Sequence, residues 1–307
     1  MISNAASTFL PLDGLYEPSA IVQLRDGRFL VVEDEKEYPF SLLTIKPDGQ
    51  TSSVHLTPGL FESANGFWRV GDLEGLTLEA TGWIYAITSQ SLDGEGEAKK
   101  SREKLVRFRV EGDRVRKAKS VTGLKAALVA AHPVLAAAAG VRAAKSASGL
   151  NVEALETSPD GQRLWVGFRS PLIDGQALLA CIDNPAAIFD ADEAPRIASS
   201  LVMLDLGGNG IRGMSWVPDF GAYLLIGGPA APEGKAFGLW LWSDEPGAPA
   251  RRVRLPGLSG IERAEGVCPA VIEGRACIVI VSDDGDRQGG HCAHYLLLDP
   301  GALRVDP

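Results

Sequence analysis

Five ionisable residues recur at similar places along the chain and are the first candidates for chemistry: Glu17, Glu74, Glu153, Arg212 and Glu265. Each opens a stretch in which a Gly-containing turn joins two apolar segments. If the fold brings them together, four carboxylates will face one guanidinium. Like charges at close range cannot all stay ionised, so some must take up protons, pair with the arginine or bind a cation.

Hard carboxylate oxygens are the ligands that Ca²⁺ prefers. The sequence therefore predicts a metal site, with Ca²⁺ as its cofactor, at Glu17, Glu74, Glu153 and Glu265. Two alternatives stay open. The carboxylates could form a structural network that caps the amides of neighbouring repeats, or they could act directly as acids and bases.

A second set of polar residues follows the apolar segments: Glu33, Asp34, Ser89, Gln90, Arg169, Ser170, Ser282, Asp283 and Asp284. Arg169 and Arg212 belong to consecutive repeats, and guanidinium groups bind carboxylates and phosphates well. We predict that Arg169, Arg212, Glu74 and Glu153 bind a ligand. In the alternative interpretation, the two arginines only neutralise the carboxylates.

The elements that position these residues are predicted to be strands. Turns such as Asp26-Gly27 and Ser158-Pro159-Asp160-Gly161 join apolar runs, which is typical of hairpins. Two further strand candidates follow each pair; after the last they are His294–Leu298 and Ala302–Val305. Five such four-stranded units predict an all-β fold, a five-bladed β-propeller.

The first strand of each blade lines the axis of a propeller, so the five ionisable residues would converge on a central channel. We expect one β-propeller domain over residues 1–307. Six blades are the alternative, if residues 61–72 or the long interval between Glu74 and Glu153 supplies a degenerate blade. That interval, around residues 117–150, is rich in Ala and Leu, which predicts a short helical insertion interrupted at Pro133.

Composition narrows the class of protein. The 307 residues are 45% hydrophobic and carry a formal net charge of −9. This balance argues against a nucleic-acid partner. The sequence has no apolar run long enough to span a membrane and no signal-peptide pattern at its start, and its four cysteines form no disulfide framework. We therefore expect a cytoplasmic protein that does not enter membranes.

The motifs that open the repeats resemble those of a known family. They are Asp72-Leu73-Glu74-Gly75-Leu76, Gly149-Leu150-Asn151-Val152-Glu153-Ala154-Leu155, Ile211-Arg212-Gly213-Met214 and Ala264-Glu265-Gly266-Val267. They look like the bacterial family known as domain of unknown function 3616 and, more distantly, like the phytase-like esterase propellers. The latter resemblance implies calcium-assisted phosphoester hydrolysis, with acidic residues lining the channel. This chain departs from the pattern in two places, where Ala154 replaces a Gly and Arg212 replaces a Glu.

Together these features predict a β-propeller that binds a small polar or anionic ligand at its central channel. If it is an enzyme, the expected reaction is Ca²⁺-assisted phosphoester hydrolysis. A glycosidase would use the same carboxylates as acid and base. The alternative from another class is a non-catalytic scaffold whose blades bind a protein partner.

Overall fold

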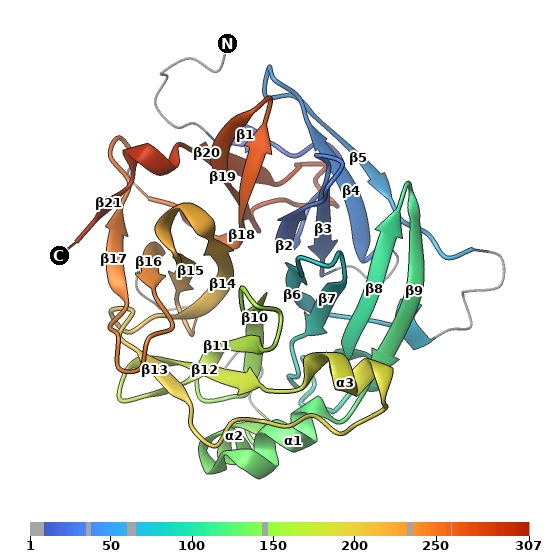
Figure 1. Cartoon of the computed structure of the whole chain (residues 1–307), viewed down its shortest axis with the longest axis vertical. Coiled ribbons are helices and arrows are strands. Elements are labelled where there is room, and N and C mark those ends of the chain that lie inside the picture. The colour runs from blue at the N-terminus through green and yellow to red at the C-terminus, as the bar shows by residue number, and fades with distance from the viewer. Residues whose placement is uncertain are drawn as a thin grey trace.

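Five antiparallel sheets surround a common axis in the computed structural model, which describes residues 9–34, 38–59, 66–142, 147–231, 236–258 and 260–306 (Figure 1). The inner strands are β2 (Pro18–Gln23), β6 (Leu73–Leu78), β10 (Asn151–Thr157), β14 (Gly210–Val217) and β18 (Ala264–Ile272). Each inner strand contacts the inner strands of both neighbouring sheets, so the ring is closed. The prediction of a five-bladed propeller is confirmed.

The second, third and fourth strands follow outward in each blade. Blade 1 contains β3 (Phe29–Glu33), β4 (Phe40–Ile45) and β5 (Thr51–His55), and blade 2 contains β7 (Ile84–Thr88), β8 (Leu105–Glu111) and β9 (Arg114–Val121). Blade 3 contains β11 (Leu164–Ile173), β12 (Gln176–Ile182) and β13 (Val202–Leu204), and blade 4 contains β15 (Ala222–Gly228), β16 (Gly238–Trp242) and β17 (Arg251–Arg254). The second strands β3, β7 and β15 are wholly buried, because each blade packs against a neighbour on both faces.

Blade 5 is completed by the beginning of the chain. It contains β19 (Arg275–Ser282) and β20 (His294–Leu298), and its outer strand is β1 (Leu10–Pro11). The prediction that residues 302–305 form the outer strand of blade 5 is therefore wrong. A short 3₁₀ turn at Pro300–Ala302 leads instead to β21 (Arg304–Val305), which pairs with β17 as a fifth strand of blade 4. Strand propensity does not specify the partner of an edge strand.

The insertion between blades 2 and 3 is helical, as predicted. Helices α1 (Leu124–Ala131) and α2 (Pro133–Ala139) bury Leu124, Leu128 and Leu135 against the facing cores of blades 2 and 3. A third helix, α3 (Pro185–Asp190), lies between β12 and β13 and was not predicted. Every helix in the described part of the chain is too short to cross a membrane.

The sixth-blade alternative finds no support in the described residues. Residues 61–65 of its predicted segment lie outside them, and Gly66–Trp68 forms a 3₁₀ turn. The helices α1 and α2 occupy the other candidate segment.

Small residues allow the inner strands to approach one another near the axis. A Cβ added to Gly75 would come within 2.8 Å of the Leu155 Cβ, and one added to Gly266 within 2.9 Å of the Ala20 Cα. Ala154, which departs from the family pattern, pairs with Gly167 of the neighbouring strand. The missing side chain at Gly167 provides the room for the extra methyl group.

Candidate functional site

A bulge occurs at the same place in every inner strand and aligns the five blades. The register between the inner and second strands shifts at an equivalent residue in every blade, and these residues are Ser19, Glu74, Glu153, Arg212 and Glu265; blade 3 has a further shift between Asn151 and Val152. We call these five residues the bulge ring. A bulge re-aims the side chain of its extra residue, here toward the channel. Four members were predicted, but the position in blade 1 belongs to Ser19 and not to Glu17, which lies two residues earlier.

The channel opens on one side of the bulge ring into a pocket of about 310 Å³. Eight carboxylates and four basic side chains line this pocket. The carboxylates are Glu17, Asp34, Asp72, Glu74, Asp93, Glu153, Glu265 and Asp283, and the basic residues are Arg102, Lys125, Arg169 and Arg212. The pocket is therefore strongly acidic, and the way in which its charges pair decides what it can bind.

One side of the pocket contains a network of paired charges, which we call the Arg–Glu network. The Glu153 carboxylate accepts a hydrogen bond from Arg169 Nη1 at 3.0 Å, and its other oxygen lies 2.9 Å from Arg212 Nη1. Arg212 Nη2 donates to Glu265. Burial lowers the pKa of Arg212, but Glu153 and Glu265 outweigh this effect and raise it above its usual range. Two of the four predicted metal ligands are thus held by arginines.

The acidic group lies on the side of blades 1 and 2 and consists of Glu17, Asp34, Asp72 and Glu74. Burial raises the pKa of Glu74 well above its usual range, and the charges of Glu153 and Asp72 raise it further. Asp34 reaches solvent at the pocket mouth. The surrounding protein nevertheless reduces its hydration and, with the charge of Asp72, raises its pKa to about 7. Burial and the mutual repulsion of carboxyl groups therefore favour the protonated forms of Glu74 and Asp34.

Asp72, a member of the acidic group, has a basic partner at the rim of the pocket. It is buried and forms an ion pair with Arg102, which also donates to the Leu92 carbonyl oxygen at 2.9 Å. This pair fixes the loop between β7 and β8 at the rim of the pocket.

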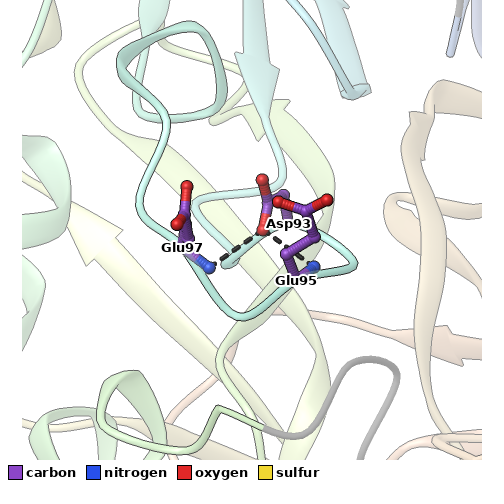
Figure 2. A group of neighbouring side chains, drawn as sticks. All are labelled: Asp93, Glu95 and Glu97. Atoms are coloured by element: carbon purple, nitrogen blue, oxygen red, sulfur yellow. Dashed lines mark hydrogen bonds between the residues drawn. The ribbon is translucent and has the colours of Figure 1, made fainter.

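A second acidic cluster, Asp93, Glu95 and Glu97, lies on that same loop (Figure 2). Asp93 Oδ1 accepts hydrogen bonds from the backbone N–H groups of Glu95 and Glu97, both at 2.9 Å. Lys99 Nζ lies 2.6 Å from Glu97 Oε2 and 3.3 Å from Asp93 Oδ2. These contacts explain the cluster as a turn with a neutralising lysine.

In the described part of the chain, only that rim cluster brings three carboxylate oxygens within 4.8 Å of one another. Neither the predicted metal ligands Glu17, Glu74, Glu153 and Glu265 nor the acidic group therefore forms such a cluster from carboxylates alone. Two neutral oxygens add to the donors of the pocket: Gln90 Oε1 and Asn151 Oδ1 are buried and have no hydrogen-bond partner among the described residues. Carboxylate and amide oxygens together are the donor set that Ca²⁺ takes, so the chemistry of the acidic side fits this ion.

The structure brings together most of the residues predicted for the site. Of the residues predicted near the channel mouth, Asp34, Gln90, Arg169, Ser170 and Asp283 line the pocket. Glu33 and Ser282 are fully buried, and Asp284 instead contacts His294, with Oδ2 2.8 Å from Nδ1.

Other lining residues were missed as site residues: Asp72, Arg102, Lys125, Asn151 and, from the insertion, Ala138, Ala139 and Val141. A spacing rule could have found two of them. Asp72 and Asn151 precede their bulge residues by two positions, as Glu17 precedes Ser19. The spacing rule cannot find Arg102, because this residue lies on a loop and not on an inner strand.

Comparison with known proteins gives one family match. Residues 19–227, more than two thirds of the chain, match the family described as "Phytase-like: Esterase-like activity of phytase". No curated protein matches the chain.

Several solved structures are similar at low identity. The Malassezia sympodialis allergen Mala s 1 is 14% identical with a TM-score of 0.47, over 91% of this chain and 78% of the allergen. A glucose dehydrogenase is 14% identical with a TM-score of 0.46, over 95% of this chain and 99% of that one. A Bombyx mori β-fructofuranosidase is 10% identical with a TM-score of 0.46, and this chain, of which 98% is covered, spans only 65% of it. None of the three carries an argument about activity.

Proposed function

Because the chain belongs to the phytase-like esterase family, we propose that it hydrolyses a small anionic phosphoester in its central pocket with the help of Ca²⁺. The observation that carries this proposal is the uneven pairing of charges around the pocket. The Arg–Glu network neutralises Glu153 and Glu265, whereas on the opposite side four carboxyl groups crowd together, and burial with the neighbouring charges raises the pKa of Glu74. We also propose membership of the family known as domain of unknown function 3616 and a cytoplasmic location.

The acidic group is where the proposal places the cation. Glu17, Asp34, Asp72 and Glu74 provide hard oxygen ligands and line the same pocket. A bound divalent cation would supply Lewis-acid chemistry toward a phosphoryl oxygen. A bound cation would hold these carboxyl groups in their ionised form and attract the anionic substrate, so the proposal makes activity dependent on the ion.

Arg169 is the residue proposed to hold the anionic part of the substrate. Its Nη1 donates to Glu153 and its Nε donates to the Pro229 carbonyl oxygen at 3.1 Å. Among the described residues its Nη2 has no partner, and the side chain lines the pocket. Nη2 is therefore available to donate to a phosphate oxygen.

For Arg212 we propose the neutralising role that the sequence left as an alternative, in place of ligand binding. Its guanidinium lies between Glu153 and Glu265 and is nearly buried. We propose that it positions these two carboxylates and does not contact the substrate. This role accounts for a basic residue in the bulge ring.

The test combines ion binding with hydrolysis. Chelator-stripped protein is scanned for thermal unfolding with and without millimolar Ca²⁺, and p-nitrophenyl phosphate and p-nitrophenyl acetate are tested as substrates. A ligand that binds only the folded state stabilises it by about 2.7 kcal/mol at a hundredfold excess over Kd. We expect Ca²⁺ to raise Tm and to be required for phosphate-ester hydrolysis.

The variants Glu74→Gln and Asp34→Asn should lose both effects. Glu245→Gln, an exposed carboxylate outside the pocket, is the control that should keep them. If no divalent ion changes Tm and no substrate is hydrolysed, the proposal is refuted and the non-catalytic interaction scaffold is favoured.

A further inference from the structure

Two amide oxygens of the pocket lack the donors that buried acceptors normally have. Gln90 Oε1 and Asn151 Oδ1 are both buried without a hydrogen-bond partner among the described residues. An acceptor left unsatisfied inside a protein is destabilising. Both residues line the pocket, so a ligand bound in the pocket could supply the missing partner.

The orientation of the Gln90 amide is fixed by its surroundings. Its Nε2 donates to the Thr88 carbonyl oxygen at 3.1 Å, to Thr88 Oγ1 at 3.0 Å and to the Lys104 carbonyl oxygen at 3.2 Å. Rotating the amide by 180° would place Oε1 against two carbonyl oxygens, which have no hydrogen to donate. Gln90 is also fully buried, and its backbone has a φ of 57°, a left-handed conformation that is strained for this residue.

The Asn151 amide is fixed in the same way by the Arg–Glu network. Its Nδ2 donates to Glu153 Oε1 at 2.8 Å, the same oxygen that accepts from Arg169. The reversed amide would place an oxygen against a carboxylate oxygen. The network therefore presents Oδ1 of Asn151 as a preset acceptor.

The two amides and one member of the acidic group lie along the junction of blades 2 and 3. The Val152 N–H donates to the Ser89 carbonyl oxygen at 2.8 Å, which joins the residue after Asn151 to the residue before Gln90. The Ser89 N–H donates to the Asp72 carbonyl oxygen at 2.9 Å. Backbone hydrogen bonds thus connect the strand ends that carry Asp72, Gln90 and Asn151.

We propose that Gln90 Oε1 and Asn151 Oδ1 are neutral ligands of the divalent cation, alongside carboxylates of the acidic group. This inference rests on the proposed function and adds ligands to its cation site. Ca²⁺ takes six to eight oxygens and accepts amide oxygens among them. Neutral ligands complete such a shell without adding negative charge to a pocket that already has an excess of carboxylates.

The experiment is calorimetric titration of Ca²⁺ into the chelator-stripped full chain. We expect Gln90→Met, which keeps the length of the side chain but lacks the oxygen, to weaken the Kd for Ca²⁺ about tenfold or more. Asn151→Ala should weaken it similarly. Ser91→Ala is the matched control, because Ser91 lines the pocket but its hydroxyl already bonds Ser89 Oγ at 2.9 Å, and its Kd should not change.

Folding of each variant is checked by its circular dichroism and thermal unfolding without Ca²⁺. If Gln90→Met does not fold, Gln90→Gly replaces it, since glycine adopts the positive φ without strain. It should show the same loss of Ca²⁺ affinity.

The outcomes separate this inference from the proposed function. If wild-type protein binds Ca²⁺ and Glu74→Gln abolishes binding, but Gln90 and Asn151 variants bind normally, the amide ligands are refuted and the proposed function stands. If wild-type protein binds no divalent ion, the proposed function itself loses its cofactor. A parallel titration with methylammonium chloride should show no binding. If methylammonium binds wild-type protein and both amide variants weaken this binding, Gln90 Oε1 and Asn151 Oδ1 accept from an ammonium group, and the inference is overturned.

Discussion

Gly213 lies directly against the backbone carbonyl oxygen of Glu265, so closely that a Cβ at Gly213 would overlap with that oxygen. The contact joins the inner strands of blades 4 and 5 one residue after Arg212. It brings Arg212 within ion-pair distance of Glu265. The close approach of the strands and the pairing of the charges are therefore parts of one arrangement.

Gly213→Ala should lower the free energy of unfolding strongly. The added methyl group meets rigid backbone, and overpacking of this kind costs about 3 kcal/mol. Urea unfolding of the two proteins measures the difference. Gly94→Ala is the comparison, since a Cβ there meets nothing within 4 Å and its φ is not positive. Equal midpoints for Gly213→Ala and wild type would contradict the packing role.

Arg212→Gln should destabilise the protein more than Arg169→Gln does. Removing Arg212 leaves Glu153 and Glu265 buried with a lost partner, and breaking a buried ion pair from one side costs about 3–5 kcal/mol. Without Arg169, Glu153 keeps Arg212, and losing one charged hydrogen bond costs about 1.5–3 kcal/mol. Chemical denaturation of both variants measures the order, and the reverse order would refute the positioning role of Arg212.

Arg169→Gln should instead show its main effect on anion binding. We expect inhibition of p-nitrophenyl phosphate hydrolysis by inorganic phosphate to weaken about tenfold, because one charge-assisted hydrogen bond is lost. Inhibition constants for wild type, Arg169→Gln and Arg169→Lys give the test. Lysine keeps the charge and should restore part of the affinity. An unchanged inhibition constant in Arg169→Gln would remove Arg169 from the substrate site.

Glu156 provides a test of pH dependence away from the pocket. It lies three residues after Glu153 and is buried, and its Oε1 accepts hydrogen bonds from Thr77 Oγ1 at 2.7 Å and the Thr157 N–H at 3.0 Å. Burial raises its pKa to about 7, although these hydrogen bonds oppose the rise. Between the pKa of the unfolded chain, 4.5, and 7, the folded state holds a proton that the unfolded state has lost.

The contribution of Glu156 to stability is therefore present below pH 4.5 and is lost as the pH rises to 7. Glu156→Gln removes this titration, so the variant should lose less stability than wild type between pH 4.5 and 7.5, by about 3 kcal/mol. Urea unfolding at a series of pH values measures the difference. Parallel stability curves for the two proteins would show that Glu156 does not titrate in this range.

The sequence was sufficient for the architecture because its signals are local. A turn between two apolar runs specifies a hairpin, and the repeated opening motifs set the number of blades. The position of the bulge is not local in this sense. Glu17 has the same residue type as Glu74, but the register of β2 with β3 makes Ser19 the bulge residue.

The lining of the pocket was harder to predict where it comes from loops and the insertion. Arg102 reaches Asp72 from the loop between β7 and β8, and Ala138 comes from α2. Neither residue has a repeat partner in the other blades that would predict its place. The pairing of Glu153 and Glu265 with Arg212 was foreseen as an alternative, and only the geometry of the side chains supports it over a free carboxylate ring.

The outer strand of blade 5 has a consequence for the order of folding. Strand β1 supplies the edge of a sheet whose other strands are the last large segment of the chain. During synthesis, blades 1 to 3 emerge with all their strands in sequence, but β1 must wait until β20 has been made. Closing this loop costs more entropy than closing a hairpin. The pairing of Leu10 and Pro11 with β20 is therefore expected to be a late and slow step of folding. We expect the ring to open first at this same pair of strands during unfolding.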